Sequence, residues 1–442
     1  MLLPLLHTAL AACRRAADAE QATHAAWPDV SRFLASTSPN SQLHILATGK
    51  ASVPTARAAL VNIVAHRLAN VIITCPPEHE EAARALHALA QVFPCDHPLP
   101  TARNVVAAQH ILTFAQSIPP TDTLLVLLSG GASAHLCLPV ASVLLTDLSA
   151  CTQALQRSSA TIRELNAVRK HIEQLKGGQL ARACRAHSLV TCILSDVLPN
   201  ADGSPALDTI ASGPTVPDST TYAQALHVLQ SRNLTQITPS ITAHLERGVQ
   251  ALEPETPKSR KDFNTSTHEI VIGSNALMLD AAATFLTSQG VHILATKHAI
   301  EGEASNIAEQ LVSLMHAQAP SPGIHALILG GEWTVNATNS TGIGGPSQEL
   351  ALATLLRMPP NTDFALLTYS SDGIDGPTSA AGAIVTSAML ANAASTTRTQ
   401  LDAALTNHDS HTALANLNAL ITTGPTGTNV NHIAVLLWQR PT

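Results

Sequence analysis

Short apolar runs rich in β-branched residues alternate with longer amphipathic stretches along most of the chain. The apolar runs predict strands at 43–47, 71–74, 124–128, 190–194, 270–273, 291–295, 326–329 and 364–368. Apolar residues at helical spacing predict helices at 2–12, 53–67, 80–91, 276–288 and 304–317. Strands that alternate with helices in this way indicate an α/β fold, in which parallel sheets are covered by helices on both faces.

The chain of 442 residues is longer than a single hydrophobic core supports, because cores stop growing at about 250 to 300 residues. Residues 253–261 are polar and charged and carry no large apolar side chain, so they are predicted to form an exposed linker. We therefore expect an N-terminal domain at residues 1–250, a linker at 251–264 and a C-terminal domain at 265–442.

Composition narrows the class of protein. Apolar residues make up 45% of the chain and charged residues 12%, which provides material for burial and excludes disorder. Aromatic residues are scarce and the formal charge is −7, so neither base stacking nor a basic face for nucleic acid is expected. Seven cysteines without a C-x-x-C pair indicate reduced thiols in a cytoplasmic protein. The apolar stretch at 124–145 is interrupted by polar residues, so no membrane segment is predicted.

Small and charged residues follow the predicted strands, where open α/β sheets bind their ligands. Gly49 and Lys50 open a helix, and a lysine is better explained there if an anion also binds, although a solvated lysine is the alternative. The string is not a Walker A loop, because Ala51 stands in place of the Ser or Thr and no glycine lies five residues before Gly49. Ser129, Gly130 and Gly131 form either a phosphate-binding nest of amides or a tight turn.

Charged residues cluster at two further places. A helical stretch carries the cations Arg169, Lys170 and Lys176 together with Asn166. It provides either a binding surface for phosphate or carboxylate, or solvated charge. Asp196, Asp372 and Asp375 follow strands and either bind Mg²⁺, accept a hydroxyl proton, or form Asx turns.

The glycines of the C-terminal half do not form a dinucleotide fingerprint. The segment 342–347 has Ser347 where the last glycine of G-x-G-x-x-G would stand. Gly330, Gly331 and Glu332 form another flexible segment at the end of a strand. The 21 histidines have no H-E-x-x-H spacing, so no transition-metal site is predicted.

Many short sequence motifs, taken together and in their order along the chain, resemble those of one family. They are the segments at 48–51, 97–100, 129–131, 164–171, 176–178, 195–197, 210–215, 302–304, 330–332, 348–352, 372–377 and 423–431. They span nearly the whole chain, which resembles the type-2 glycerate kinase family, whose C-terminal part is called the MOFRL domain. The resemblance implies a Rossmann-like N-terminal domain, a C-terminal α/β domain of MOFRL type and an interdomain cleft. It also implies ATP-dependent phosphorylation of D-glycerate at the 2-hydroxyl, with Mg²⁺.

Roles follow for the matching residues, as implied by the resemblance. The catalytic residues would be Lys50, Arg169 and Asp196. The residues that bind substrate or nucleotide would be Gly49, Ser129, Gly130, Gly131, Asn166, Lys170, Lys176, Gly330, Gly331, Glu332, Gln348, Asp372 and Asn429. Asp196 and Asp372 would hold the metal. The expected partners are a small hydroxy acid and a nucleotide, and a homodimer is left open.

The chain departs from the family pattern at polar positions. Pro346 stands where the family has a catalytic arginine, and Cys75 stands where it has a lysine. An arginine on a transferred phosphoryl group contributes about 10³ to 10⁵ in rate. Two alternatives are therefore kept: a kinase for a different small hydroxy acid, and a degenerate homologue that binds nucleotide or carboxylate without efficient turnover.

Overall fold

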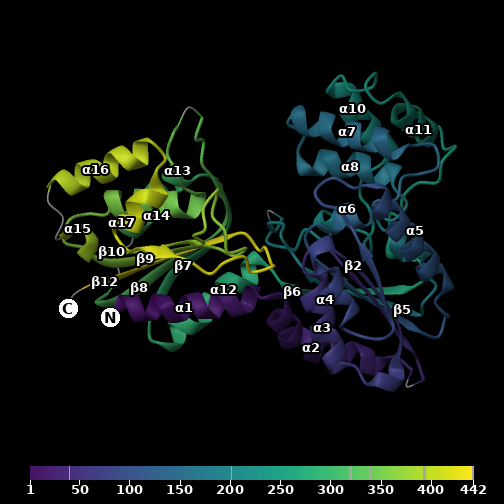
Figure 1. Ribbon diagram of the computed structural model, residues 1–442, viewed down its shortest axis with the longest axis horizontal. Coiled ribbons are helices and arrows are strands. Elements are labelled where there is room, and N and C mark those ends of the chain that lie inside the picture. The colour runs from purple at the N-terminus through teal and green to yellow at the C-terminus, as the bar shows by residue number, and fades with distance from the viewer. Residues whose placement is uncertain (39, 201, 318–320, 339, 392–394, 441–442) are drawn as a thin grey trace. The chain divides into compact units, whose positions relative to one another are not determined.

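The computed structural model describes residues 1–38, 40–200, 202–317, 321–338, 340–391 and 395–440. They form two compact units, which we describe separately (Figure 1). Unit 1 comprises Met1–Ala22, Ser195–Pro205 and Gly273–Thr442, and unit 2 comprises Thr23–Leu194 and Ala206–Ile272. Residues 1–22 and 195–205 thus pack with the C-terminal part, although the predicted domains place them in the N-terminal one. The predicted boundaries themselves stay a prediction.

Unit 2 is built around a sheet of six strands in the order β3-β2-β1-β4-β5-β6. The strands are β1 (Leu43–Thr48), β2 (Leu68–Cys75), β3 (Ala90–Pro94), β4 (Thr123–Leu128), β5 (Ser188–Leu194) and β6 (Ser266–Gly273). Neighbouring strands from β3 to β5 are parallel. Because β1, β4 and β5 are buried along their whole length, they appear in the sequence as continuous apolar runs. The predicted Rossmann-like parallel sheet is confirmed.

The helices of unit 2 fall into two groups (Figure 1). One group accompanies the sheet and comprises α2 (Ala19–Ser36, which begins in unit 1), α3 (Ser52–Asn62), α4 (Glu80–Arg84), α5 (Ala102–Ser117), α6 (Ala132–His135) and α9 (Gln179–Ala183). The other is a bundle of α7 (Leu145–Arg157), α8 (Ile162–Ile172), α10 (Tyr222–Ser231) and α11 (Pro239–Val249), with its own apolar core. The predicted helix at 80–91 is too long, since its last residues begin the edge strand β3.

Unit 1 contains a second sheet of six strands, in the order β11-β10-β9-β12-β8-β7. The strands are β7 (His292–Glu303), β8 (Gly323–Thr334), β9 (Asp363–Ser370), β10 (Gly382–Thr386), β11 (Leu420–Ile421) and β12 (His432–Arg440). Only β7 and β8 pair in parallel, whereas the other neighbours are antiparallel. The expectation of a parallel sheet is wrong here, because the unpredicted strand β12 inserts between β8 and β9 and runs against both.

Helices cover both faces of the unit 1 sheet (Figure 1). On one face α1 (Leu2–Ala17) packs against α12 (Asn275–Ser288) and against β9 and β12. The other face carries α13 (Ala304–Ala317), α14 (Pro346–Arg357) and α17 (Ser410–Asn416), while α15 (Ala388–Ala391) and α16 (Ser395–Thr406) lie nearby. The predicted amphipathic helix at the start of the chain is confirmed, with Leu6 and Leu10 buried. In the described ranges no helix has both the length and the apolar character to cross a bilayer.

Candidate active site

The turns that follow β1 and β4 lie directly against each other. The backbone N–H of Lys50 donates to the Gly130 carbonyl at 2.8 Å, and the Ala51 N–H donates to the Ser129 hydroxyl at 3.1 Å. Gly49 has φ of +107°, and a Cβ atom there would lie 2.4 Å from the Ser129 hydroxyl oxygen. Only glycine satisfies both requirements. Two of the predicted motifs therefore form one structure at the carboxyl edge of the parallel sheet.

His135, which was not among the predicted site residues, forms hydrogen-bonding contacts with these turns. Its side chain is fully buried, and its Nδ1 accepts the Gly49 N–H at 3.3 Å and lies 3.1 Å from the Thr74 hydroxyl. Burial, followed by the charge of His97, lowers the pKa of His135 to about 4. A neutral imidazole can accept the Gly49 hydrogen, which an imidazolium cannot. The only sequence signal was its position, four residues after Gly131.

The Lys50 side chain is exposed and lies over Gly131. A Cβ atom on Gly131 would be 3.1 Å from Lys50 Cγ and 3.2 Å from His97 Cδ2, so both side chains border this glycine. Desolvation, and then the positive charge of Lys50, lowers the pKa of His97 to about 4. A neutral histidine thus accompanies the lysine beside this glycine.

Two of the predicted cations are already paired inside unit 2. Lys170 is buried and its Nζ lies 3.2 Å from Asp218 Oδ1. Lys176 is fully buried, with its Nζ 2.5 Å from Glu173 Oε2 and 2.8 Å from the Ser133 carbonyl oxygen. Burial lowers the pKa of Lys176. In this structure both ammonium groups support the protein framework instead of pointing to solvent.

Arg169 and Asn166 lie beside the end of the glycine turn. Arg169 donates to the Ser133 carbonyl at 3.4 Å, and its side chain is only 13% exposed. Its Nε makes no hydrogen bond with the described residues, although Glu173 Oε1 lies 3.6 Å away. Asn166 accepts a hydrogen bond from the Ser212 hydroxyl at 2.9 Å, and that hydroxyl also lies 3.2 Å from the Ser133 hydroxyl. Of the four cations predicted in unit 2, Lys50 and Arg169 keep hydrogen-bonding capacity for a ligand.

The predicted residues of unit 1 are gathered by two loops. Asp372 follows β9 and accepts the Ser370 hydroxyl at 2.7 Å and the Ile374 N–H at 3.1 Å, which is the geometry of an Asx turn. The loop at 423–431 is hydrogen-bonded to this turn, because Val430 N–H donates to the Ser371 hydroxyl at 2.7 Å. Asn429 is exposed on that loop and accepts the Asn431 N–H at 2.9 Å. Asp372 and Asn429 therefore lie on adjoining loops.

Asp375 and Gln348 form a buried cap at the start of α14. Asp375 accepts the N–H groups of Ser347 and Gln348 at 2.9 and 2.8 Å, and the Gln348 side-chain amide at 2.9 Å. Burial raises the pKa of Asp375 to about 6, against the effect of these donors. The Gln348 carbonyl oxygen lies 2.8 Å from His411 Nδ1. The side chains of Asp375 and Gln348 thus both stabilise the N-terminal end of α14.

Gly330 and Gly331 allow close packing in β8, and Glu332 follows them. A Cβ atom on Gly330 would be 2.2 Å from Asn275 Oδ1, and one on Gly331 would be 1.9 Å from the Ile300 carbonyl oxygen. Desolvation, then the charges of Glu301 and Asp196, raises the pKa of Glu332. Asp196 is thus one of two carboxylates whose charge acts on Glu332. No group of three or more His, Cys, Asp or Glu residues arranged for a metal ion occurs in the described part of the chain.

Family comparisons agree with the geometry. The domain of unknown function DUF4147 matches residues 5–246, and the MOFRL family matches residues 325–432. A glycerate 2-kinase of Pyrococcus horikoshii is 32% identical over 90% of this chain and 87% of the relative. A D-glycerate 2-kinase of Thermotoga maritima is 32% identical over 94% of this chain and 95% of the relative. The chain belongs to the glycerate kinase family.

The crystal structure of a glycerate kinase from Thermotoga maritima has the same fold. It superposes with a TM-score of 0.83 at 31% identity and covers 98% of this chain and 99% of the other. Another member, from Agrobacterium vitis, is provisionally named a hydroxypyruvate reductase and is 33% identical over 90% of this chain and 88% of its own length. That name makes the reduction of hydroxypyruvate a second reaction to test.

The departures from the glycerate kinase pattern have structural explanations. Pro346 is the first residue of α14, where proline is favoured because its fixed φ suits a helix start and no N–H is needed. Cys75 is fully buried at the end of β2, where burial raises its pKa to about 11 and keeps the thiol neutral. Each of these positions thus holds a neutral group that packs well, where the resemblance led us to expect a cation.

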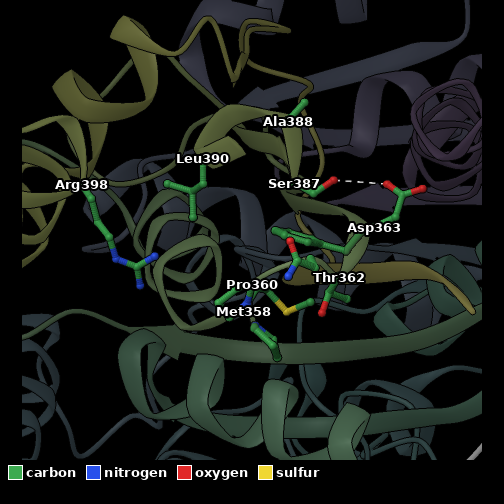
Figure 2. A pocket seen from close by; sticks show the side chains of 11 residues that line it. Met358, Pro360, Thr362, Asp363, Ser387, Ala388, Leu390 and Arg398 are labelled. Atoms are coloured by element: carbon green, nitrogen blue, oxygen red, sulfur yellow. Dashed lines mark hydrogen bonds between the residues drawn. The ribbon is translucent and has the colours of Figure 1, made fainter. Parts of the chain in front are cut away.

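Unit 1 contains a cavity whose lining includes no predicted site residue. It measures about 420 Å³ and lies beside the start of β9, with Met358, Asp363, Ser387, Leu390 and Arg398 among its lining residues (Figure 2). Ser387 donates to Asp363 at 3.2 Å. Arg398 donates to the Leu356 carbonyl at 2.6 Å, so its guanidinium is partly used. None of the predicted site residues lines this cavity.

Proposed function

We propose that the protein is a glycerate 2-kinase, which transfers the γ-phosphoryl group of ATP to the 2-hydroxyl of D-glycerate. One observation carries the proposal: Lys50 lies over Gly131 where two adjacent parallel strands end. Ligands of open α/β sheets bind at this edge, and a lysine beside a glycine turn suits a phosphate. The names of the relatives from Pyrococcus horikoshii and Thermotoga maritima support the substrate and the 2-position.

The chemistry of phosphoryl transfer matches what these residues offer. The transition state is loose, so the protein mainly positions the reactants and neutralises charge. Lys50 is an exposed ammonium cation, and Arg169 adds a second cation, a guanidinium, next to the glycine turn. His97 and His135 are neutral at pH 7 because their pKa values are lowered to about 4. They hold the turn without adding charge.

Asp196 and Glu332 fit a magnesium ion bound together with the nucleotide. Mg²⁺ prefers carboxylate oxygens and usually keeps one or two protein carboxylates plus substrate phosphates and water. Two carboxylates of unit 1 support this proposal, because the charge of Asp196 contributes to the raised pKa of Glu332. When bound, Mg²⁺ would supply charge neutralisation at the phosphate oxygens. Asp372 remains the second proposed ligand residue.

We extend the proposal to the cytoplasm as the place of action. All seven cysteines are buried and free. Unpaired cysteines in this number are typical of a reducing compartment.

A different hydroxy acid is the second candidate substrate. It is favoured by Pro346 and Cys75, since the loss of two family cations changes the charge that a substrate meets. A substrate with fewer negative charges, or with its own neutralising group, would need neither cation.

The test is a kinase assay coupled directly to enolase. Enolase dehydrates 2-phosphoglycerate, whereas 3-phosphoglycerate gives no signal until phosphoglycerate mutase is added. We expect a signal with D-glycerate, ATP and Mg²⁺ before mutase is added. ADP release is measured in parallel for a panel of 2-hydroxy acids, and NADH oxidation is measured with hydroxypyruvate. Turnover of another acid but not of glycerate would support the second candidate, and NADH oxidation alone would overturn both.

Lys50→Ala tests the proposed residue. We expect kcat/KM to fall by about 10² to 10³, as for loss of one charge-stabilising donor. Lys261→Ala is the matched control, because Lys261 is exposed on a short helix (Arg260–Asp262) away from the glycine turns. Equal activity of the two variants would contradict the role of Lys50.

A further inference from the structure

A second cavity in unit 1 combines arginines and hydroxyl groups. It measures about 370 Å³, which falls in the range of roughly 300 to 1,000 Å³ of small-molecule sites. It lies between the C-terminal turn of α1 and the loop at 423–428. Its lining includes Arg14, Arg15, Tyr369, Thr423, Thr426 and Thr428. No predicted site residue is among them.

The charge of the cavity is positive and available. Arg14 and Arg15 occupy the last turn of α1, and both side chains are exposed. Neither forms an ion pair with any residue that the structure describes. Asp18 also lines the cavity, but its Oδ1 accepts the Gln21 N–H at 2.8 Å. Two arginines and one engaged carboxylate leave a net attraction for an anion.

One hydroxyl in the lining has no partner. Thr428 is 7% exposed, and its Oγ1 is buried without a hydrogen bond to the described residues. Its neighbours are engaged: Thr426 donates to the Ser371 carbonyl at 2.6 Å and Thr423 donates to the Gly424 carbonyl at 3.0 Å. A buried hydroxyl without a partner is destabilising, because the loss of its hydrogen bonds to water is not compensated. Thr428 lines the cavity, so a ligand oxygen that its hydroxyl reaches would compensate this desolvation.

We propose that this cavity binds the phosphate group of a small phosphate monoester, or inorganic phosphate. Arginine is the residue that matches phosphate oxygens in a bidentate manner, and two stand side by side at the rim. The Thr428 hydroxyl supplies a donor for a further oxygen. Tyr369 is the one aromatic side chain among the lining residues, which does not provide a sandwich for a nucleotide base. The proposal goes beyond the kinase reaction, although the lining loop adjoins Asp372 of the proposed kinase site, whose carbonyl accepts the Thr426 N–H at 2.9 Å.

The test is isothermal titration of the full-length protein with inorganic phosphate, with glycerol 3-phosphate and with glycerol. We expect at least one phosphate compound to bind with Kd below about 1 mM, and glycerol not to bind. Tighter binding of glycerol 3-phosphate identifies a monoester site, and equal binding identifies a site for the phosphate group alone. Absence of binding by both phosphate compounds overturns the proposal.

Variants assign the binding to this cavity. Arg14→Ala/Arg15→Ala should weaken binding by at least about tenfold, and the isosteric Thr428→Val by about three- to tenfold. Arg32→Ala is the matched control, since Arg32 is an exposed helical arginine that does not line the cavity. Lys50→Ala should leave binding unchanged. Binding that is lost in Lys50→Ala and kept in the double arginine variant overturns this proposal and leaves the proposed kinase intact.

Discussion

The imidazole of His135 accepts the backbone hydrogen of Gly49 from a fully buried position, at 3.3 Å. Gly49, the residue before Lys50, is thereby held by two contacts: its N–H group donates to His135, and its Cα lies against the Ser129 turn. The lysine itself needs no partner in the protein framework. Its direction is set by the backbone, and this arrangement leaves the ammonium group available for a ligand.

Gly49→Ala should abolish most of the activity. The new Cβ would lie 2.4 Å from the Ser129 hydroxyl, and φ of +107° is unfavourable for alanine. Strain of this kind costs about 1 to 3 kcal/mol before the clash is added. Gly290→Ala is the control, because Gly290 has φ of +77° with nothing within 4 Å of an added Cβ. Thermal unfolding and kcat/KM are measured for both, and equal losses would show that the Ser129 contact is unimportant.

His135→Asn should reduce the loss of stability in acid. The pKa of His135 is about 4 in the folded protein, and that of an unfolded histidine is about 6.5. The unfolded state binds the proton first, so the free energy of unfolding falls as the pH drops from about 6.5 to 4, by about 3 kcal/mol for this group. Urea unfolding across this range checks the slope. The exposed His66→Asn should keep the wild-type slope, and an unchanged slope in His135→Asn would contradict the argument.

Lys176→Met should destabilise unit 2 more than it affects the chemistry. It removes the cation 2.5 Å from the buried Glu173 and leaves the more distant Arg169 Nε at 3.6 Å, which costs up to about 3 to 5 kcal/mol. The double variant Lys176→Met/Glu173→Gln should recover part of this free energy, since it removes the poorly compensated charge. Urea unfolding gives the free energies, and kcat/KM of the folded enzyme is compared. A stable Lys176→Met protein with a large loss of kcat/KM would instead indicate direct ligand binding by Lys176.

Pro346→Arg should raise activity on D-glycerate. It places a cation at the first position of α14. An arginine that stabilises a transferred phosphoryl group contributes about 10³ to 10⁵ in rate in GTPases. We expect an increase of at least about tenfold in kcat/KM, with a small loss of stability. Pro346→Met is the control for removal of the proline. Equal activity of the arginine and methionine variants would show that another residue already supplies the charge.

The parallel sheet and its glycine turns could be predicted because both signals are local. Strands buried on both faces form apolar runs, and the carboxyl ends of β1 and β4 meet at one edge, which brings Gly49 to Ser129. The antiparallel arrangement of unit 1 could not be predicted in this way. It depends on the choice of partners by β12, which is made at long range and leaves no periodic signal.

Which of the predicted cations are paired inside the protein also could not be predicted from local sequence. Lys170 and Lys176 stand in the same short stretch as Arg169, and nothing in their spacing separates them. The difference is made by Asp218, far along the chain, and by the burial of Glu173. His135 was missed for the opposite reason, since a lone histidine in an apolar stretch has no pattern. Whether these residues act in catalysis stays a prediction.

The packing of α1 on the C-terminal half has a consequence for biosynthesis. Its buried face, with Leu6 and Leu10, contacts α12, β9 and β12, all of which are translated long after it. Until these elements leave the ribosome the buried face of α1 lacks its complete docking surface, and contacts so distant along the polypeptide form slowly. The apolar face of α1 is therefore uncovered during most of the synthesis of the chain.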